Sequence, residues 1–254
     1  MQSRSPFEWP RSLWRLLTLL GSSGQAAGAF SLRRLRGPLT IADRAQWLHK
    51  WCDLTLRRLN IEVASQGNFP SRGLLVSNHL SYLDILVFSA LSPCVFVSKK
   101  EVQSWPLYGS LANMAGTLYV DRNRSSDAQR VSREMMQALA QGTVVVLFPE
   151  GTSSDGSSVL PFRPALFEAA VASGERIWPS HIGYTAERGS VEQEICYWGG
   201  MSFLPHLLRL MSLRGIRASV KFAADSMKFE DRKLAAQTTQ KVVSMLASPL
   251  QVAN

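Results

Sequence analysis

The sequence predicts an α/β protein in which a mostly parallel central sheet is flanked by helices, with amphipathic helices at the N-terminus. Three observations support this prediction. From about residue 60 onward, short apolar runs of strand length alternate with longer stretches of helical periodicity. The hydrophobic content is 46% and the charged content 19%, which is compatible with a sizeable buried core. A chain of 254 residues suits one large domain better than two small ones.

The individual elements follow from this alternation. Strands are expected at residues 61–64, 74–77, 95–98, 117–120, 144–148, 176–184, 195–198 and 218–222. Helices are expected at residues 80–91, 107–115, 126–140, 164–173, 203–211 and 232–246. Ser126 and Asp127 suit the start of the third of these helices, and Gly142 suits its end. Strands that alternate with helices usually pair in parallel, with the helices on the two faces of the sheet.

The first 60 residues are predicted to form two amphipathic helices, joined by a Gly- and Ser-rich linker at residues 21–39. Pro10 suits a first helical position, and tryptophan and leucine recur at helical spacing after it. In the first helix these residues are Trp9, Leu13, Leu16, Leu17 and Leu20, with Arg11 and Arg15 on the other side. A Trp- and Leu-rich face opposite arginines is typical of helices that lie in a membrane interface. The alternative is that both helices pack on the core.

The charge of the chain is concentrated in this N-terminal region. Residues 1–60 hold ten of the Lys and Arg residues and three acidic ones, and the whole chain carries +9. Such a segment is attracted to an anionic surface, either acidic lipid or nucleic acid. The apolar face favours lipid, and no nucleic-acid-binding module is visible. Residues 16–32 are interrupted by Gly and Ser, so we expect neither a membrane-spanning helix nor a cleaved signal peptide.

The strongest candidate for chemistry is the segment that follows the apolar run 74–77. His79 falls in the expected strand-to-helix turn, and Asp84 falls in the first turns of the next helix. In open α/β sheets, ligands bind at this edge of the sheet. A carboxylate can hold an imidazole in one orientation and tautomer, as a general base requires. Taken alone, however, a His and an Asp at this spacing are more often a helix cap and a surface charge.

Three other segments place polar groups near strand ends. Residues 116–122 end in the pair Asp121 and Arg122, which suits a phosphate or carboxylate ligand or an ordinary surface ion pair. Residues 149–156 form a Pro-, Gly-, Ser- and Asp-rich loop after a buried strand, suited to an anion or to hydroxyl groups, although such residues also form plain turns. Arg163 precedes a helix and can complement an anionic head group.

These segments together resemble the glycerolipid acyltransferase family, which acylates glycerol phosphate and lyso-phospholipids. The resemblance covers roughly residues 72–184, and its blocks occur in the order found in the family. The matching blocks are N-H-x-x-x-x-D at residues 78–84, G-x-x-x-[IV]-D-R at 116–122, F-P-E-G-T at 148–152 and an apolar-Pro strand at 177–182. One block alone is weak evidence, whereas four blocks at these spacings are strong evidence.

The resemblance implies an O-acyltransferase whose catalytic domain spans residues 61–254. By this resemblance His79 removes a proton from the acceptor hydroxyl, and Asp84 orients the imidazole ring. The residues implied around the acceptor head group are Arg122, Glu150, Gly151, Thr152 and Arg163. Supporting positions are Asn78, Ser81, Gly116, Pro149 and Ser153. No metal or cofactor is expected. The acyl donor would be acyl-CoA or acyl carrier protein, and because both are acidic, the basic residues Lys99, Lys100 and Arg124 could bind either one.

The sequence leaves the acceptor open. Many relatives that use lysophosphatidate have Arg where this chain has Ser153, so one phosphate-binding charge is missing. Residues 197–206 also resemble a subgroup that contains lyso-ornithine-lipid O-acyltransferases. Lysophosphatidate is the first expectation and a lyso-ornithine lipid the second. We expect an enzyme at the cytoplasmic face of the membrane, peripheral or monotopic, while a non-catalytic membrane-binding protein is the alternative of another class.

Other enzyme classes lack their motifs in this chain. There is no G-x-S-x-G, G-x-G-x-x-G or P-loop sequence. The remaining histidines, His49, His181 and His206, have no metal-binding spacing and are expected to be structural. Cys52, Cys94 and Cys196 are odd in number and widely spaced, which favours a reducing compartment.

Overall fold

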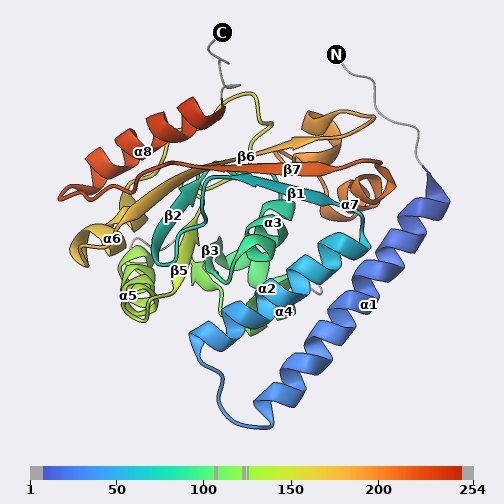
Figure 1. The fold of residues 1–254 in the computed structure, drawn as a ribbon, viewed down its shortest axis with the longest axis horizontal. Coiled ribbons are helices and arrows are strands. Elements are labelled where there is room, and N and C mark those ends of the chain that lie inside the picture. Colours follow the sequence, from blue (N-terminus) through green and yellow to red (C-terminus); the bar gives the residue numbers. More distant parts are fainter. Residues whose placement is uncertain (1–7, 106–107, 122–123, 125, 248–254) are drawn as a thin grey trace.

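The computed structural model describes residues 8–105, 108–121, 124 and 126–247, which fold around a seven-stranded sheet (Figure 1). The strands lie in the order β1-β7-β6-β2-β5-β3-β4, and all neighbours pair in parallel except β6 and β7. Their bounds are β1 Glu62–Gln66, β2 Gly73–Ser77, β3 Val95–Lys99, β4 Leu118–Val120, β5 Val144–Leu147, β6 Ile177–Thr185 and β7 Arg217–Phe222. The predicted α/β fold with a mostly parallel sheet is confirmed.

Helices cover both faces of the sheet and enclose two apolar cores (Figure 1). Leu75 of β2 points into one core, while Leu74 and Val76 point into the other, and all three are fully buried. This two-sided burial explains why β2 appears in the sequence as a continuous apolar run. The first core is covered by α2 (Ile41–Arg58), α3 (Leu83–Leu91) and α7 (Phe203–Ser212), and the second by α5 (Asp127–Ala140), α6 (Glu168–Ala172) and α8 (Arg232–Ala247).

The strand expected at residues 195–198 is wrong. The chain instead forms a π-helical turn, η3 (Val191–Ile195), followed by an irregular segment. Ile195 and Cys196 are buried as expected of a strand, but the backbone groups of the segment bond elsewhere. The N–H of Cys196 closes the π-turn on Val191, and the N–H of Tyr197 donates to the carbonyl of Leu80. The segment therefore packs beside the turn after β2.

The linker expected at residues 21–39 is also wrong, because one helix, α1 (Trp9–Arg34), continues through most of it. Tertiary packing overrides the weak helix propensity of Gly and Ser here. Ser22 is buried and its hydroxyl accepts a hydrogen bond from Arg58 of α2, and Trp47 donates to the carbonyl of Ala26. Small residues on this face allow α2 to approach closely. Only residues 35–40 remain between the two helices.

The two faces of α1 are placed the opposite way round from an ordinary core helix. Arg11, Ser12 and Arg15 point inward and donate to carbonyls at the C-terminal end of α7, Arg15 to Leu213 at 2.7 Å. Arg15 is only 4% exposed. A cation at a helix C-terminus is favoured by the helix dipole. Five large apolar residues point outward, with exposed fractions of 47–69%, although Leu19 is buried: Trp9, Leu13, Trp14, Leu17 and Leu20. Leu16, expected in this stripe, packs against the core instead.

Smaller differences concern where helices begin. The helix expected from residue 80 begins at Leu83, because residues 80–82 curl around the Asp84 carboxylate. The helix expected at residues 164–173 is split into a 3₁₀ turn, η2 (Ala165–Phe167), and α6. The remaining short elements are η1 (Lys100–Ser104) and α4 (Tyr108–Met114). Among the described helices, none combines the length and the apolar character needed to cross a bilayer.

Candidate active site

His79 and Asp84 meet at the C-terminal edge of the sheet, directly after β2. The Nδ1 atom of His79 lies 2.7 Å from the Oδ2 atom of Asp84. Because the Oδ2 atom of a carboxylate accepts hydrogen bonds, the geometry assigns the proton to Nδ1 of His79 and leaves Nε2 as the basic nitrogen. The side chain of His79 is 22% exposed, whereas that of Asp84 is fully buried. This is the arrangement of a general base with an orienting carboxylate.

Local structure fixes both groups of the pair. The Oδ2 atom of Asp84 also accepts the backbone N–H groups of Leu80 at 2.7 Å and Ser81 at 3.0 Å. The imidazole ring stacks on Phe148, with ring centroids 4.3 Å apart and an interplanar angle of 15°. The ring is therefore held at its edge by a carboxylate and on its face by an aromatic side chain.

The turn that carries His79 is tied to two other segments. The side-chain amide of Asn78 donates to the carbonyl of Ile182 and accepts the N–H of the same residue, at 2.9 and 2.8 Å. This bridges the end of β2 to β6. The carbonyl of His79 accepts the N–H of Ser154 at 2.9 Å, so the loop after β5 is fastened to the turn. Ser153 donates its hydroxyl to the carbonyl of Tyr197.

Glu150 lies beneath this loop, away from the described pockets. Its side chain is 3% exposed and accepts the N–H groups of Leu160, at 3.2 Å, and of His79. Burial, together with the nearby charge of Asp84, raises the pKa of Glu150 to about 8. Its Oε2 atom has no hydrogen-bond partner among the described residues, as fits a protonated acid. The contacts give Glu150 a place in the frame of the loop rather than on its surface.

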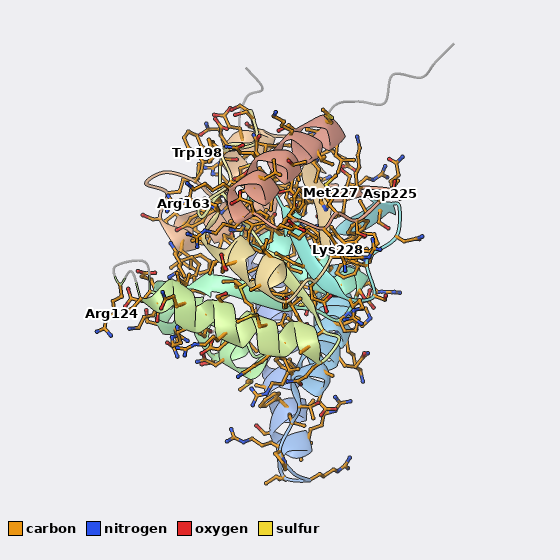
Figure 2. All side chains as sticks on the ribbon, turned by 90° about the vertical axis from the view of Figure 1, so that its left-hand side faces the viewer. Arg124, Arg163, Trp198, Asp225, Met227 and Lys228 are labelled. Carbon is orange, nitrogen blue, oxygen red and sulfur yellow. The ribbon has the colours of Figure 1, made fainter. Side chains whose placement is uncertain are left out.

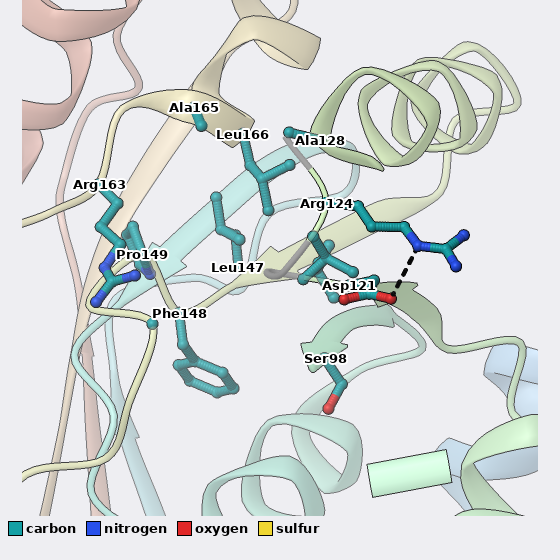
Figure 3. Close-up of a pocket in the computed structure, with 13 residues that line it drawn as sticks. Ser98, Asp121, Arg124, Ala128, Leu147, Phe148, Pro149, Arg163, Ala165 and Leu166 are labelled. Carbon is teal, nitrogen blue, oxygen red and sulfur yellow. Dashed lines mark ion pairs between the residues drawn. The ribbon is translucent and has the colours of Figure 1, made fainter. Parts of the chain in front are cut away.

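A charged pocket of about 330 Å³ opens beside this loop (Figure 3). Arg163 and Arg124 line it together with Asp121, and the Arg124 Nε atom lies 3.8 Å from an Asp121 oxygen. Arg163 has no acidic partner within the described part of the chain. Gly151 has φ +76° and a side chain there would meet Arg163 at 3.1 Å, so glycine lets the guanidinium lie against the loop. Figure 2 shows Arg163 and Arg124 along one side of the molecule.

Two further pockets join the charged one in a row. A pocket of about 150 Å³ is lined by His79, Lys99 and Thr152 and shares Phe148 and Gly151 with the charged pocket. An apolar cavity of about 110 Å³ follows between α1, α2 and α4. The residues that it shares with the His79 pocket are Tyr82, Ile85, Ser98, Val102 and Tyr108. His79 therefore lies between a charged pocket and an apolar cavity.

The other expected site residues lie in two of the pockets, at the turn after α4, or outside the described residues. Pro149 and Gly151 line the charged pocket, and Thr152 and Ser153 line the His79 pocket. Gly116 lies at the turn after α4, where its φ is +77° and a side chain would meet Arg44 of α2. Arg122 lies outside the described residues, so its role stays a prediction.

Sequence reasoning missed three side chains of the site. Phe148 was noted only as part of a block, and no local pattern indicates that its ring stacks on His79. Tyr184 of β6 donates its hydroxyl to the Oδ1 atom of Asp84 at 2.6 Å, from 100 positions away in the chain. Tyr197 lines the His79 pocket from a segment predicted to be a strand. The parallel pairing of β2 with β5 and β6 brings Phe148 and Tyr184 to the His79–Asp84 pair, and the hydrogen bond from Tyr197 N–H to the Leu80 carbonyl brings Tyr197.

Comparisons with known proteins identify the family of the chain. A family model described as Acyltransferase matches residues 60–183. A lyso-ornithine lipid O-acyltransferase of Pseudomonas aeruginosa is 35% identical over 215 residues, which cover 83% of this chain and 82% of that protein. A 1-acyl-sn-glycerol-3-phosphate acyltransferase of Neisseria gonorrhoeae is 33% identical over 177 residues, 68% of this chain and 69% of that protein.

A solved structure extends the likeness to the whole fold. The crystal structure of a 1-acyl-sn-glycerophosphate acyltransferase from Thermotoga maritima matches with a TM-score of 0.67 and 19% identity. The match covers 96% of this chain and 99% of that chain, so it includes the N-terminal helices. The chain therefore belongs to the acyltransferase family that contains the lyso-ornithine lipid and 1-acylglycerol-3-phosphate O-acyltransferases.

Proposed function

We propose that this acyltransferase moves a fatty acyl group from a thioester to the free hydroxyl of a lyso-lipid, with His79 as the general base. The observation that carries the proposal is the position of His79, hydrogen-bonded to Asp84, between a charged pocket and an apolar cavity. An acyl transfer between lipids needs these three parts together: a base, a place for a polar head group and a place for a hydrocarbon chain.

The chemistry follows from the free Nε2 atom of His79. It takes the proton of the acceptor hydroxyl as the hydroxyl oxygen attacks the thioester carbonyl. Asp84 stabilises the imidazolium that forms. The tetrahedral intermediate then collapses, the C–S bond breaks, and the leaving thiolate takes the proton back from His79. The acceptor alcohol replaces the enzyme serine of a hydrolase triad, so no covalent acyl-enzyme is needed.

The charged pocket favours a phosphate-bearing acceptor, and we propose 1-acylglycerol-3-phosphate, converted to phosphatidate. Arg163 and Arg124 supply two guanidinium groups, which suit phosphate oxygens. The single carboxylate of the pocket, Asp121, is already within 3.3 Å of the Lys100 ammonium group. Positive charge therefore exceeds negative charge around the pocket, as a doubly charged phosphate requires.

A lyso-ornithine lipid is the second candidate acceptor. Its head group carries one carboxylate and one ammonium, and Arg163 and Asp121 offer one partner for each. Ser153 uses its hydroxyl to hold Tyr197, so this position contributes no positive charge to the site. The match to the Pseudomonas aeruginosa lyso-ornithine lipid enzyme over most of both chains also supports this candidate.

The apolar cavity suits the acyl chain of the donor thioester. Its lining is hydrophobic and aromatic and includes Trp51 of α2 and Leu111 of α4. The donor would enter past Lys99, which lines the His79 pocket and lies over the Trp105 ring at 5.8 Å. Lys99 and the nearby Lys100 suit the acidic carrier of either candidate donor, acyl-CoA or acyl carrier protein. No resident cofactor or metal is proposed.

The outward face of α1 suits a lipid surface, and we propose attachment to the cytoplasmic face of the membrane from one side. The exposed stripe from Trp9 to Leu20 has no covering element among the described residues. Basic residues flank the same region, including Arg33 and Arg34 in the last turn of α1. An apolar stripe beside basic residues binds the interface of an anionic bilayer.

One assay tests the reaction and the acceptor together. Purified protein with a long-chain acyl thioester should release free thiol only when a lyso-lipid is added. His79→Ala should lower the rate ~10²–10⁴-fold. His49→Ala is the matched control, because His49 bonds to the Ser89 carbonyl on α3 and lines none of the three pockets.

The outcomes separate the alternatives. A higher kcat/KM with lysophosphatidate than with lyso-ornithine lipid supports the phosphate acceptor, and the reverse order supports the second candidate. Full activity of His79→Ala would exclude the proposed base. Binding to liposomes without thiol release from any donor and lyso-lipid pair would indicate a non-catalytic membrane-binding protein.

A further inference from the structure

The Asp84 carboxylate has a second oxygen that faces away from His79. Its Oδ2 atom accepts the His79 ring N–H and two backbone N–H groups, while its Oδ1 atom accepts the hydroxyl of Tyr184 at 2.6 Å. Asp84 is fully buried and has no Lys or Arg partner among the described residues. These four donors are therefore what compensates its negative charge.

Tyr184 is held in a fixed place by the sheet. It lies on β6, is 8% exposed and belongs to the core below α3 and α7. Asn78 clamps Ile182, two positions before it, to the end of β2. Burial, and then the Asp84 charge, raise the pKa of Tyr184 well above its usual value. The phenol thus keeps its proton and acts only as a donor.

We propose that Tyr184 is a positioning residue that completes a chain of hydrogen bonds, His79–Asp84–Tyr184, called the relay below. In this chain Tyr184 keeps its proton and limits how strongly Asp84 favours the protonated form of His79. The inference rests on the proposed role of His79 as the base. Tyr184 does not reach the His79 pocket, so it acts through Asp84 alone. A short hydrogen bond from a neutral donor spreads the carboxylate charge and fixes the rotation of the carboxylate plane.

The direction of the effect follows from this charge distribution. Without the Tyr184 hydroxyl, more negative charge remains on Asp84 and the imidazolium form of His79 is favoured. The base would then be protonated at higher pH than in the wild type. Other titratable or charged groups also face the His79–Asp84 pair, and a substitution at position 184 leaves their chemical identity the same in variant and wild type.

These groups are Glu150 of the loop after β5, Lys99 at the end of β3, Tyr82 beside α3, Tyr108 of α4, His181 of β6, and Cys196 and Tyr197 after η3.

The experiment is a pH profile of kcat/KM for Tyr184→Phe, which removes one oxygen and keeps the ring. We expect kcat to fall roughly tenfold, as for other groups that orient a functional imidazole, with KM changed less than about twofold. The acidic limb of the profile should move about half a pH unit upward. A loss of packing alone would lower activity or stability without moving this limb.

A second variant covers the case in which the phenylalanine protein does not fold. With 3-fluorotyrosine at position 184 the phenol is more acidic and donates a stronger hydrogen bond. The acidic limb should therefore move downward, opposite to the shift in Tyr184→Phe. Tyr119→Phe is the matched control, since it removes a buried phenol oxygen from β4 without touching Asp84, and its limb should match the wild type.

The result that overturns the inference is an acidic limb that stays within error of the wild type in both Tyr184 variants while His79→Ala is inactive. Tyr184 would then serve packing only. If His79→Ala keeps full activity, the proposed base is wrong and the relay fails with it. Opposite shifts of the two variants, with no shift in Tyr119→Phe, establish the relay.

Discussion

The turn at residues 78–84 and the helix α1 differ in which side chains they bury and which they expose. At the turn, two buried polar side chains are bonded on several sides: Asn78 bridges two strands and Asp84 accepts four hydrogen bonds, while the buried hydroxyl of Ser81 has no partner among the described residues. In the first half of α1, the polar side chains of Arg11 and Arg15 face inward, and five large apolar side chains between Trp9 and Leu20 face outward. Burying polar groups costs free energy unless they are hydrogen-bonded, and a contiguous exposed apolar patch is uncommon in a protein surrounded only by water.

The difference shows what each region is built to contact. Buried polar groups that are fully hydrogen-bonded hold a site rigid, and here they hold the imidazole of His79. Exposed apolar residues gain free energy only when another apolar phase covers them. The turn is thus organised around a small reacting group, and α1 around an extended surface.

The largest expected effect comes from removing the charge at the turn. Asp84→Asn keeps the size of the side chain, but its amide cannot stabilise the imidazolium form of His79. We expect kcat to fall on the order of 10³–10⁴-fold, as when an orienting aspartate in a catalytic triad is replaced by asparagine. Initial rates of thiol release measure this effect.

The matched control for Asp84→Asn is Asp53→Asn. Asp53 forms an exposed ion pair with Arg57 on α2 and has no contact with the turn. Exposed pairs contribute little to stability, so this variant should keep wild-type activity. A fall of less than tenfold in Asp84→Asn would show that the carboxylate charge does not assist the base.

The next effect in size concerns the outward face of α1. Replacing both Leu13 and Leu17 by Ser removes two side chains that are 57% and 59% exposed. If these side chains enter lipid, each loses roughly 1.5–3 kcal/mol of burial, so binding to anionic vesicles should weaken at least tenfold. Co-sedimentation with phosphatidylglycerol-containing vesicles measures the change.

The control for the α1 variant lies on the other side of the sheet. Leu234 and Met245 on α8 are 54% and 72% exposed, and α8 covers the opposite face of the sheet from α1 and α2 (Figure 1). Replacing both by Ser should leave vesicle binding unchanged. Equal weakening in the two double variants would mean that no particular face of the molecule meets the membrane.

Most of the sheet and the central pair could be predicted from sequence because their signals are local. The strand β2 is a continuous apolar run, and His79 and Asp84 are five positions apart in the turn that follows it. The ordered blocks then indicated the family, which the comparisons confirm. The sequence therefore predicts the residues whose role depends on segments next to them in the chain.

The rest depends on contacts between distant segments. Tyr184 meets Asp84 only because β6 pairs with β2, and the amphipathic pattern of α1 does not reveal which face packs inward. The burial of Arg15 could not be predicted, since nothing in the sequence indicates that the end of α7 offers it carbonyl partners. The expected strand at residues 195–198 failed for the same reason, because its backbone bonds to the turn after β2.

The smallest effect concerns Glu150, the acid buried under the loop. Its pKa is about 8 in the folded protein and about 4.5 in an exposed carboxyl, because burial disfavours the charged form. The folded state therefore keeps a proton that the unfolded chain releases at lower pH. The stability that this proton gives is complete below about pH 4.5 and is lost as the pH rises through about 8.

Glu150→Gln tests this linkage, because the amide side chain of glutamine does not titrate in this pH range. Between about pH 4.5 and 8 the free energy of unfolding of the wild type should decline by up to about 1.4 kcal/mol per pH unit from this group, and that of the variant should decline less. Urea unfolding at several pH values measures both slopes. Glu230→Gln, at an exposed position, should keep the wild-type slope. Parallel slopes in Glu150→Gln and the wild type would mean that Glu150 is already charged in its buried position, stabilised by the N–H groups of Leu160 and His79.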